Sequence, residues 1–387
     1  MSENPPVRST GRAAVAVPSQ REPAPGGPAG LPPGGPGGPG GPNRRGGVYP
    51  GRGRRRPRWG RIFLVFGIAA LVLALVAAGG GYLWYRSVSN DIDRTDAFSG
   101  ITGDRPAKPV EGALNILMLG SDSRDPDNKD KAGEWRTDTM LIAHIPANHE
   151  KAYLISIPRD LYVQIPKSPT NPELGGHKAK INAAFAWGGV PLAVQTVEGF
   201  TGLRMDHVVV IDFGGFKQVV DALGGIDMYI EQDVKSIHPP NRQFKKGNAH
   251  LNGAEALDYV RQRYQFPNGD FDRMRHQQQF MKAVLDKAAS SGTLTNLSKL
   301  NSFLRATAQA VTVDQDLSVL DMAQTFRGIR SDDLVFSTAP HLGNKKVNGE
   351  DVIMPDTEKG AALYTAIKND KAEDWFAANA SPSTSTK

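Results

Sequence analysis

The 387-residue chain contains no cysteine. Disulfide bonds, thiol catalysis and cysteine-ligated metal sites are therefore excluded. Its eight histidines lack the spacing of a zinc site. The sequence also has no Gly-x-Ser-x-Gly elbow, no P-loop and no dinucleotide-binding fingerprint, so nothing in it indicates a nucleophilic serine or a bound nucleotide.

Lysine is absent from residues 1–61, which hold 11 arginines and two acidic residues, a charge of +9. The remainder has 35 basic and 38 acidic residues, a charge of −3, within a net charge of +6. Because the positive charge belongs to a tail and not to a folded face, we expect no nucleic-acid partner. Proline, glycine and alanine dominate the segment, which predicts a disordered tail over residues 1–61.

A long apolar run follows this tail. Residues 62–85 are free of charge, and a helix of this length spans about 30 Å of hydrocarbon. Arginines crowd its N-terminal side, which predicts a cytoplasmic N-terminus, a single transmembrane helix in the cell membrane and an extracellular folded domain. A cleavable signal ending near Ala77-Ala78-Gly79 is the alternative. The aromatic outer end, with Tyr82 and Trp84, favours the anchor.

Beyond the apolar run, we expect a stalk over residues 86–112, a folded domain over 113–375 and a flexible tail over 376–387. Short apolar runs bounded by turn residues predict buried strands at 114–120, 139–145, 152–158 and 207–212. Helical patterns lie at 191–200, 216–223, 254–259 and 272–289, and Asn252 is a candidate helix cap. This alternation predicts an α/β fold, a layered α-β-α domain with a central mixed sheet.

Four polar side chains indicate a phosphate site. Arg261 and Arg263 lie on one side of an extended Arg-Gln-Arg segment, and Arg273 and Gln277 lie one turn apart on a predicted helix. Guanidinium groups match phosphate oxygens well. The alternative is that these arginines form an ordinary solvated surface.

Acidic residues upstream suggest a metal ion beside the phosphates. Asp122 and Asp138, with Arg159 nearby in sequence, supply the oxygen ligands that a magnesium ion bridging phosphates requires. Two alternatives stay open. Asp122 is also typical of a turn after Gly120, and Arg136 and Asp138 could form an ion pair at a strand end.

Seven motifs in order resemble the LytR-CpsA-Psr family, most strongly over residues 113–290. They are LMLGSDSR (117–124), RTDTM (136–140), SIPRDLYVQIP (156–166), KINAAFAWGG (180–189), VVIDFGGFKQVVDALGGI (209–226), LNGAEALDYVRQR (251–263) and GDFDRMRHQQQ (269–279). The resemblance implies an outward-facing, membrane-anchored enzyme. Such an enzyme moves a glycopolymer of teichoic acid, capsule or arabinogalactan type from a polyprenyl-diphosphate carrier to peptidoglycan.

The resemblance also implies roles for individual residues. Asp122 and Asp138 would coordinate Mg²⁺ near Arg136, and either aspartate could accept the hydroxyl proton. The residues implied to bind the diphosphate are Arg159, Arg261, Arg263, Arg273 and Gln277. His276 stands where family members commonly have arginine, so it is either a weaker, pH-dependent part of the site or a helix-surface residue. Asn182 could orient a phosphate or cap a helix.

The sequence therefore predicts a Mg²⁺-dependent phosphotransferase with a lipid-linked glycan donor, a peptidoglycan acceptor and a membrane partner. We expect its lipid to lie in an apolar sleeve formed by runs such as 181–198 and 207–223. Two other functions stay open. The same groups could hydrolyse a lipid diphosphate, or the protein could be a non-enzymatic membrane-bound regulator that binds lipid.

Overall fold

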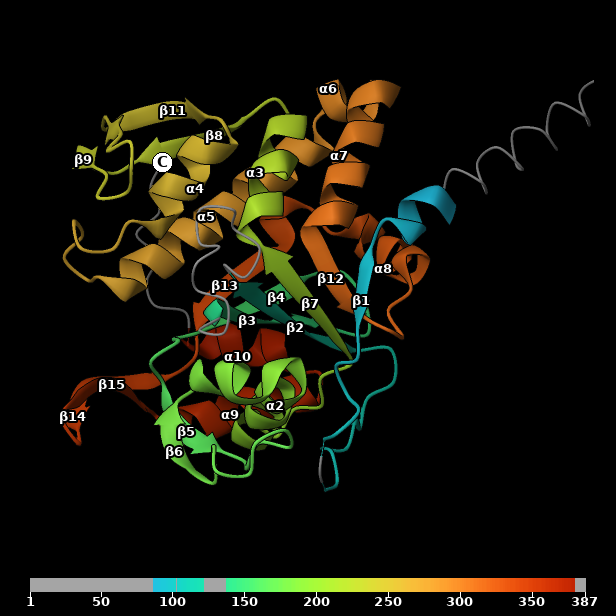
Figure 1. Cartoon of the computed structure of the whole chain (residues 1–387). Coiled ribbons are helices and arrows are strands. Elements are labelled where there is room, and N and C mark those ends of the chain that lie inside the picture. The colour runs from blue at the N-terminus through green and yellow to red at the C-terminus, as the bar shows by residue number, and fades with distance from the viewer. Residues whose placement is uncertain (1–85, 102, 122–136, 380–387) are drawn as a thin grey trace, which may run out of the picture. The chain divides into compact units, whose positions relative to one another are not determined.

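A mixed β-sheet forms the centre of the folded domain (Figure 1). The computed structural model describes residues 86–101, 103–121 and 137–379. Within these ranges, seven strands pair in the order β1-β12-β7-β2-β3-β4-β13. They are β1 (Asp93–Thr95), β12 (Val311–Asp314), β7 (His207–Asp212), β2 (Leu114–Ser121), β3 (Thr137–Ile145), β4 (Ala152–Ile157) and β13 (Leu334–Thr338). The β1–β12, β2–β7 and β4–β13 pairs are parallel and the others antiparallel, which confirms the predicted mixed sheet.

The central strands are buried on both faces, which explains why they read as continuous apolar runs. Successive side chains of a strand point to opposite faces. In β2, Leu117 and Leu119 belong to the core on one face of the sheet, whereas Ile116 and Met118 belong to the cluster on the other face. Each face therefore needs a helical layer to cover it.

Helices supply these two layers (Figure 1). One face is covered by α2 (Ala183–Thr201), α9 (Thr357–Lys368) and α10 (Ala372–Asn379). The opposite face carries α3 (Phe213–Ala222), α4 (Gly253–Arg261), α5 (Asp270–Ala289) and α7 (Leu297–Ala310). Shorter elements are α6 (Ser291–Leu294), α8 (Val319–Thr325), η2 (Phe326–Gly328) and η3 (Ser331–Asp333). The architecture is the predicted α-β-α sandwich.

Four two-stranded sheets lie outside the central sheet in the described part of the chain. They are β5 (Tyr162–Ile165) with β6 (His177–Lys180), β8 (Ile226–Ile230) with β11 (Gly247–Leu251), β9 (Val234–Lys235) with β10 (Gln243–Phe244), and β14 (His341–Val347) with β15 (Glu350–Pro355). The β15 strand lies beside the start of β5, because the Ile353 amide donates to the Asp160 carbonyl at 2.9 Å and Ile353 forms a parallel bridge with Leu161.

The helices that carry the predicted phosphate residues begin within two residues of the predicted positions. Asn252 caps α4: its side chain accepts from the Glu255 amide while the Glu255 carboxylate accepts from the Asn252 amide. This reciprocal pair satisfies two backbone donors that would otherwise lack partners. α5 starts at Asp270, two residues before the predicted start, and ends at the predicted Ala289.

The packed domain extends beyond the predicted stalk and tail boundaries. β1 joins the sheet beside β12, Ala97 is 1% exposed in the core, and Arg105 donates to the buried carboxylate of Glu198 at 2.6 Å. Residues 86–112 are thus not a separate stalk over their described part. At the other end, Phe376 stacks on Tyr153 with ring centroids 4.9 Å apart. The first segment has apolar and charged contacts with partners far away in sequence, and the second has an aromatic contact of this kind.

The predicted tail (1–61), the predicted membrane span (62–85) and residues 380–387 lie outside the described ranges. Among the helices within those ranges, none has both the length and the apolar composition that a membrane span requires.

Candidate functional site

The candidate site lies at the end of the central sheet where most of its strands terminate, which we call this edge of the sheet. The parallel and antiparallel pairings bring the carboxyl ends of β2, β4, β7 and β13 to this edge, together with the start of β3. Arg159 follows the end of β4 by two residues, and α3 begins directly after β7. In layered α/β proteins, ligands bind outside the carboxyl ends of strands.

All five residues predicted to bind a diphosphate line one hollow at this edge, which we call the arginine pocket. Its volume is about 180 Å³. The predicted residues in its wall are Arg159, Arg261, Arg263, Arg273 and Gln277. Ile237, His238 and Tyr264 complete the wall. The structure therefore brings together side chains from the β4–β5 turn, the end of α4, the following loop and α5.

A buried glutamine fixes the Arg-Gln-Arg segment. Gln262 is fully buried, and its Nε2 donates to the Asp258 carboxylate at 2.7 Å and to the Ser236 hydroxyl at 2.8 Å. With Gln262 held inward, its two neighbours, Arg261 and Arg263, both line the arginine pocket. This is the one-sided placement that the sequence predicted, although Arg261 ends α4 and is not part of an extended strand.

An aspartate that the sequence analysis missed connects two of the arginines. The Asp270 carboxylate lies 2.6 Å from Arg273 Nη2 and 3.9 Å from Arg159 Nε. Asp270 and Arg273 are both more than nine-tenths buried, so the pair is well shielded from water. The spacing of three residues on α5 was the signal available in the sequence. Asp270 therefore pairs closely with Arg273 and lies near Arg159, whose Nε is also 3.8 Å from Asp160.

The described part of the pocket wall holds four arginines and one histidine, His238, and the histidine is neutral. Burial lowers the pKa of His238, and the nearby positive charge of Arg261 lowers it further. His238 therefore offers one donor and one acceptor at neutral pH, without adding charge. The cationic character of the pocket comes from the arginines.

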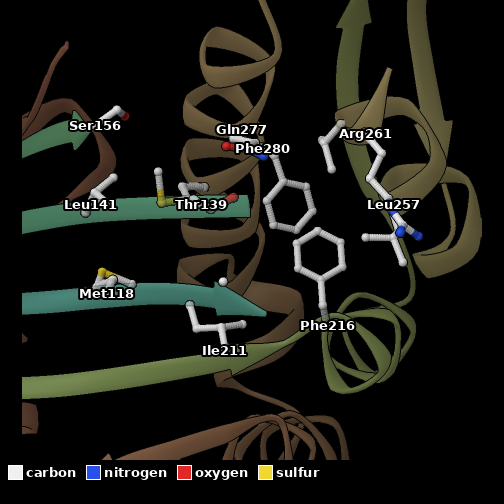
Figure 2. A pocket seen from close by; sticks show the side chains of 13 residues that line it. Met118, Thr139, Leu141, Ser156, Ile211, Phe216, Leu257, Arg261, Gln277 and Phe280 are labelled. Atoms are coloured by element: carbon white, nitrogen blue, oxygen red, sulfur yellow. The ribbon is translucent and has the colours of Figure 1, made fainter. Parts of the chain in front are cut away.

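A second, apolar pocket adjoins the first (Figure 2). Met118, Leu141 and Ile211 line it from the sheet, and Leu257 lines it from α4. The rings of Phe216 and Phe280 lie between these walls, stacked with centroids 4.1 Å apart. Arg261 and Gln277 line both pockets, so the apolar pocket opens where the arginine pocket begins.

Of the two runs predicted to form an apolar sleeve, one lines the apolar pocket, and whether this pocket holds lipid stays a prediction. The run 207–223 lines the apolar pocket through Ile211 and Phe216. The run 181–198 does not, because α2 packs with Leu117 and Leu119 on the opposite face of the sheet. The residues from β2, β3, α4 and α5 were missed, since an apolar side chain gives no sequence signal that separates pocket lining from ordinary core.

The predicted metal-binding residues are described only in part. Asp122 and Arg136 lie outside the described residues, and Asp138 is described through its backbone alone. In the β2–β3 pairing, Gly120 pairs with Thr139 and Ser121 with Thr137, so Asp138 is an extra, bulged residue at this edge. β-Bulges are frequent beside active sites. Within the described ranges, no group of three or more acidic or histidine side chains could hold a metal ion.

Two further residues differ from expectation. His276 is fully buried and packs on the rings of Tyr259 and Phe266, at 4.9 and 4.4 Å between centroids, so it is neither a helix-surface residue nor part of the arginine pocket wall. Burial lowers its pKa. Asn182 occupies the N-cap position of α2 without a capping hydrogen bond, and it lines a different hollow beside β6.

Comparison with known proteins identifies the family. The model of the LytR_cpsA_psr family matches residues 86–369. The chain belongs to the LytR-CpsA-Psr family. The matched range begins well before Ala113, in agreement with the packing of β1 into the sheet.

Relatives in this family are transferases of cell-wall polymers. The chain is 30% identical over 298 residues to the polyisoprenyl-teichoic acid–peptidoglycan teichoic acid transferase TagU of Bacillus cereus, covering 74% of this chain and 90% of that protein. The crystal structure of Bacillus subtilis TagV superposes with a TM-score of 0.55 at 29% identity, covering 68% of this chain and 98% of that one. TagT bound to LI-WTA superposes with a TM-score of 0.55 at 25% identity, covering 71% and 99%.

Proposed function

We propose that this protein is a membrane-anchored transferase that moves a phosphoglycan from a polyprenyl-diphosphate carrier to peptidoglycan. One observation carries the proposal: an apolar pocket and an arginine pocket share Arg261 and Gln277 in their walls. This arrangement suits a ligand with an apolar chain joined directly to an anionic head. A lipid diphosphate is such a ligand, and the names of the relatives specify a polyisoprenyl-linked donor and a peptidoglycan acceptor.

The arginine pocket suits the chemistry of this transfer. A hydroxyl oxygen of the acceptor attacks the phosphorus that bears the glycan, and the bond from this phosphorus to the bridging oxygen breaks. The bridging oxygen keeps the electron pair and leaves as polyprenyl phosphate. Arg159, Arg261 and Arg273 would stabilise the charge that develops on this leaving group, and a new phosphodiester joins glycan and acceptor.

The same two aspartates are candidates for binding the metal ion and for accepting the hydroxyl proton. Asp138 is the bulged residue near the start of β3, and Asp122 follows the last residue of β2 in the sequence. The end of β2 and the start of β3 lie beside the apolar pocket. We assign them to Mg²⁺, with one of them as the proton acceptor. When bound, the ion would supply positive charge beside the phosphates. Gly120 and Thr139, which line the apolar pocket, support this placement.

The proposal extends to topology. The apolar run at 62–85 and the arginines before it would anchor the chain in the cell membrane, with its N-terminal tail inside and the catalytic domain outside. The donor lipid and the peptidoglycan acceptor both lie on that outer side.

A substitution that fills the apolar pocket tests whether this pocket binds the lipid part of the donor. Ile211→Trp places a large ring in the pocket wall, and we expect it to weaken binding of a polyprenyl-diphosphate glycan at least tenfold. Affinity for a water-soluble sugar diphosphate without the lipid should stay within about twofold, because the arginine pocket is unchanged. Ile211→Val is the matched control, expected to bind both like the unmodified protein. Equal weakening of both ligands by Ile211→Trp would contradict the proposed lipid site.

A further inference from the structure

A polar groove adjoins the arginine pocket at Arg263. It consists of two hollows of about 440 and 480 Å³. The inner hollow lies beside the start of α5, between Arg263 and the β14–β15 hairpin. The outer hollow lies between the β5–β6 hairpin, the start of α2 and the turn of β14–β15. We call the two hollows together the side groove.

The arginine pocket and the two hollows of the side groove are neighbours that share wall residues. Arg263 lines both the arginine pocket and the inner hollow, and Val352 lines both hollows. A salt bridge of 3.5 Å joins Asp160 in the inner wall to Lys180 in the outer wall. The two sides are also tied through the backbone, since the Ile353 amide donates to the Asp160 carbonyl. The groove is therefore part of the folded domain and has a preformed wall.

The side chains of the groove suit a carbohydrate. Phe271 lines the inner hollow, while Trp187 and Tyr162 line the outer one and offer apolar ring faces. Amides lie between them, from Asn268 and Asn344 in the inner hollow and from Asn182 and Asn348 in the outer hollow. Amides both donate and accept hydrogen bonds, as hydroxyl and acetamido groups require.

The charge balance favours a neutral glycan over a polyanion. Among the described residues that line the side groove, the acidic members are Asp160, Asp270, Asp351 and Glu350, and the lysine and arginine members are Lys178, Lys180 and Arg263. Four negative and three positive side chains leave no positive surplus. A polyanionic donor chain would require such a surplus.

We propose that the side groove binds the glycan strand of the peptidoglycan acceptor. This inference rests on the proposed function. The geometry of the three sites supports it: the apolar pocket adjoins the arginine pocket at Arg261 and Gln277, whereas the side groove adjoins it at Arg263. In this proposal the lipid enters the arginine pocket past Arg261 and Gln277 and the acceptor enters past Arg263, so that the attacking hydroxyl and the leaving phosphate use separate entrances, which suits an in-line displacement.

Direct binding tests the groove separately from turnover. The probe is a tetrasaccharide of alternating N-acetylglucosamine and N-acetylmuramic acid whose lactyl carboxyl groups are capped as amides, so that it is neutral, and it is titrated into the purified full chain by calorimetry. Trp187→Ala removes the largest ring of the groove, and we expect it to weaken tetrasaccharide binding and to raise the KM for the acceptor, each by about tenfold. Affinity for the lipid-linked donor should not change. Trp187→Phe keeps a ring face and should lose less.

Two further variants keep the test decisive. Tyr229→Ala removes an aromatic ring that is 44% exposed on β8, outside the groove, and should leave tetrasaccharide binding unchanged. Glu350→Ala alters the exposed rim and should weaken tetrasaccharide binding even if Trp187→Ala fails to fold. Unchanged tetrasaccharide affinity in folded Trp187→Ala and in Glu350→Ala would overturn the inference. Loss of donor affinity in place of tetrasaccharide affinity would also overturn it. Groove-dependent tetrasaccharide binding without any transfer by the unmodified protein would support the groove and contradict the proposed function.

Discussion

At the scale of single residues, the arginine pocket depends on one buried carboxylate. Asp270 contacts Arg273 at 2.6 Å and lies 3.9 Å from Arg159. We expect Asp270→Asn to lower kcat by about tenfold or more, because Arg273 loses the charged partner at 2.6 Å that helps to orient its guanidinium group. The donor KM should change less than threefold, since no phosphate ligand is removed. Steady-state kinetics of transfer would measure both.

The matched control for this substitution lies on the same helix. Asp286→Asn also removes a carboxylate from α5, but Asp286 is exposed and outside the pocket wall. It should leave kcat and KM unchanged. A normal kcat in folded Asp270→Asn would show that Asp270 does not orient Arg273 for transfer.

How far the site could be predicted depends on the chemistry of each residue. The side-chain chemistry of Arg263, Arg273 and Gln277 by itself indicates phosphate binding, and the structure places these residues in one pocket. Phe216 and Phe280 could not be found, because an apolar residue has the same sequence pattern in a pocket wall as in a core. Burial decides between these roles, and burial is set by the tertiary fold.

At the scale of helices and strands, α4 begins at a capping residue and ends at a residue of the arginine pocket. Asn252 caps its first turn and Arg261 is its last residue. We expect Asn252→Ala to lower the free energy of unfolding by about 1 kcal/mol and to weaken donor binding severalfold, because fraying of α4 loosens Arg261 and the segment after it. Chemical denaturation and donor titration would measure the two effects.

α7 provides a matched control for this capping substitution. Asn296 caps α7 by accepting from the Lys299 amide, and it lines neither of the two pockets. Asn296→Ala should cost a similar free energy of unfolding and leave donor binding unchanged. Equal losses of donor affinity in both variants would indicate a general effect of stability and not a local effect of α4.

The elements themselves could largely be predicted, whereas their partners could not. The apolar runs at 114–120, 139–145, 152–158 and 207–212 became strands of the sheet. The stalk prediction failed because the segment is polar and contains Pro106 and Pro109, while its packing depends on contacts such as that of Arg105 with Glu198, 93 residues away. Local composition does not contain this information. For the same reason, the sequence could not show which face of the sheet α2 covers.

At the scale of the whole domain, a buried histidine predicts how stability varies with pH. His144 on β3 is fully buried, and its Nδ1 lies 2.9 Å from the Asn115 side-chain oxygen on β2. Burial lowers its pKa to about 4, although the charge of Asp370 acts in the opposite direction. In the unfolded chain the pKa is about 6.5. Between these values the unfolded state binds more protons than the folded state.

The contribution of His144 to the free energy of unfolding is therefore fully present above about pH 6.5 and is lost as the pH falls towards 4. Between pH 7 and pH 5 this loss amounts to about 2 kcal/mol. We expect His144→Gln, which cannot take up a proton, to lose correspondingly less free energy of unfolding over that interval. Denaturant titrations at the two pH values measure the difference. Parallel losses in the variant and in the unmodified protein would contradict this role of His144.

The proposed transferase function requires one site that holds a lipid diphosphate and transfers its phosphoglycan. The most direct measurement incubates the purified full chain with a polyprenyl-diphosphate glycan, peptidoglycan fragments and Mg²⁺, and follows the products by mass spectrometry. We predict a phosphoglycan adduct on the peptidoglycan, lost when Mg²⁺ is chelated and reduced about 10²- to 10³-fold by Arg263→Ala. Arg327→Ala, an exposed arginine on η2, should transfer normally. Free phosphoglycan without an adduct would indicate a hydrolase, and bound donor without turnover would indicate a lipid-binding regulator; either result would contradict the proposed function.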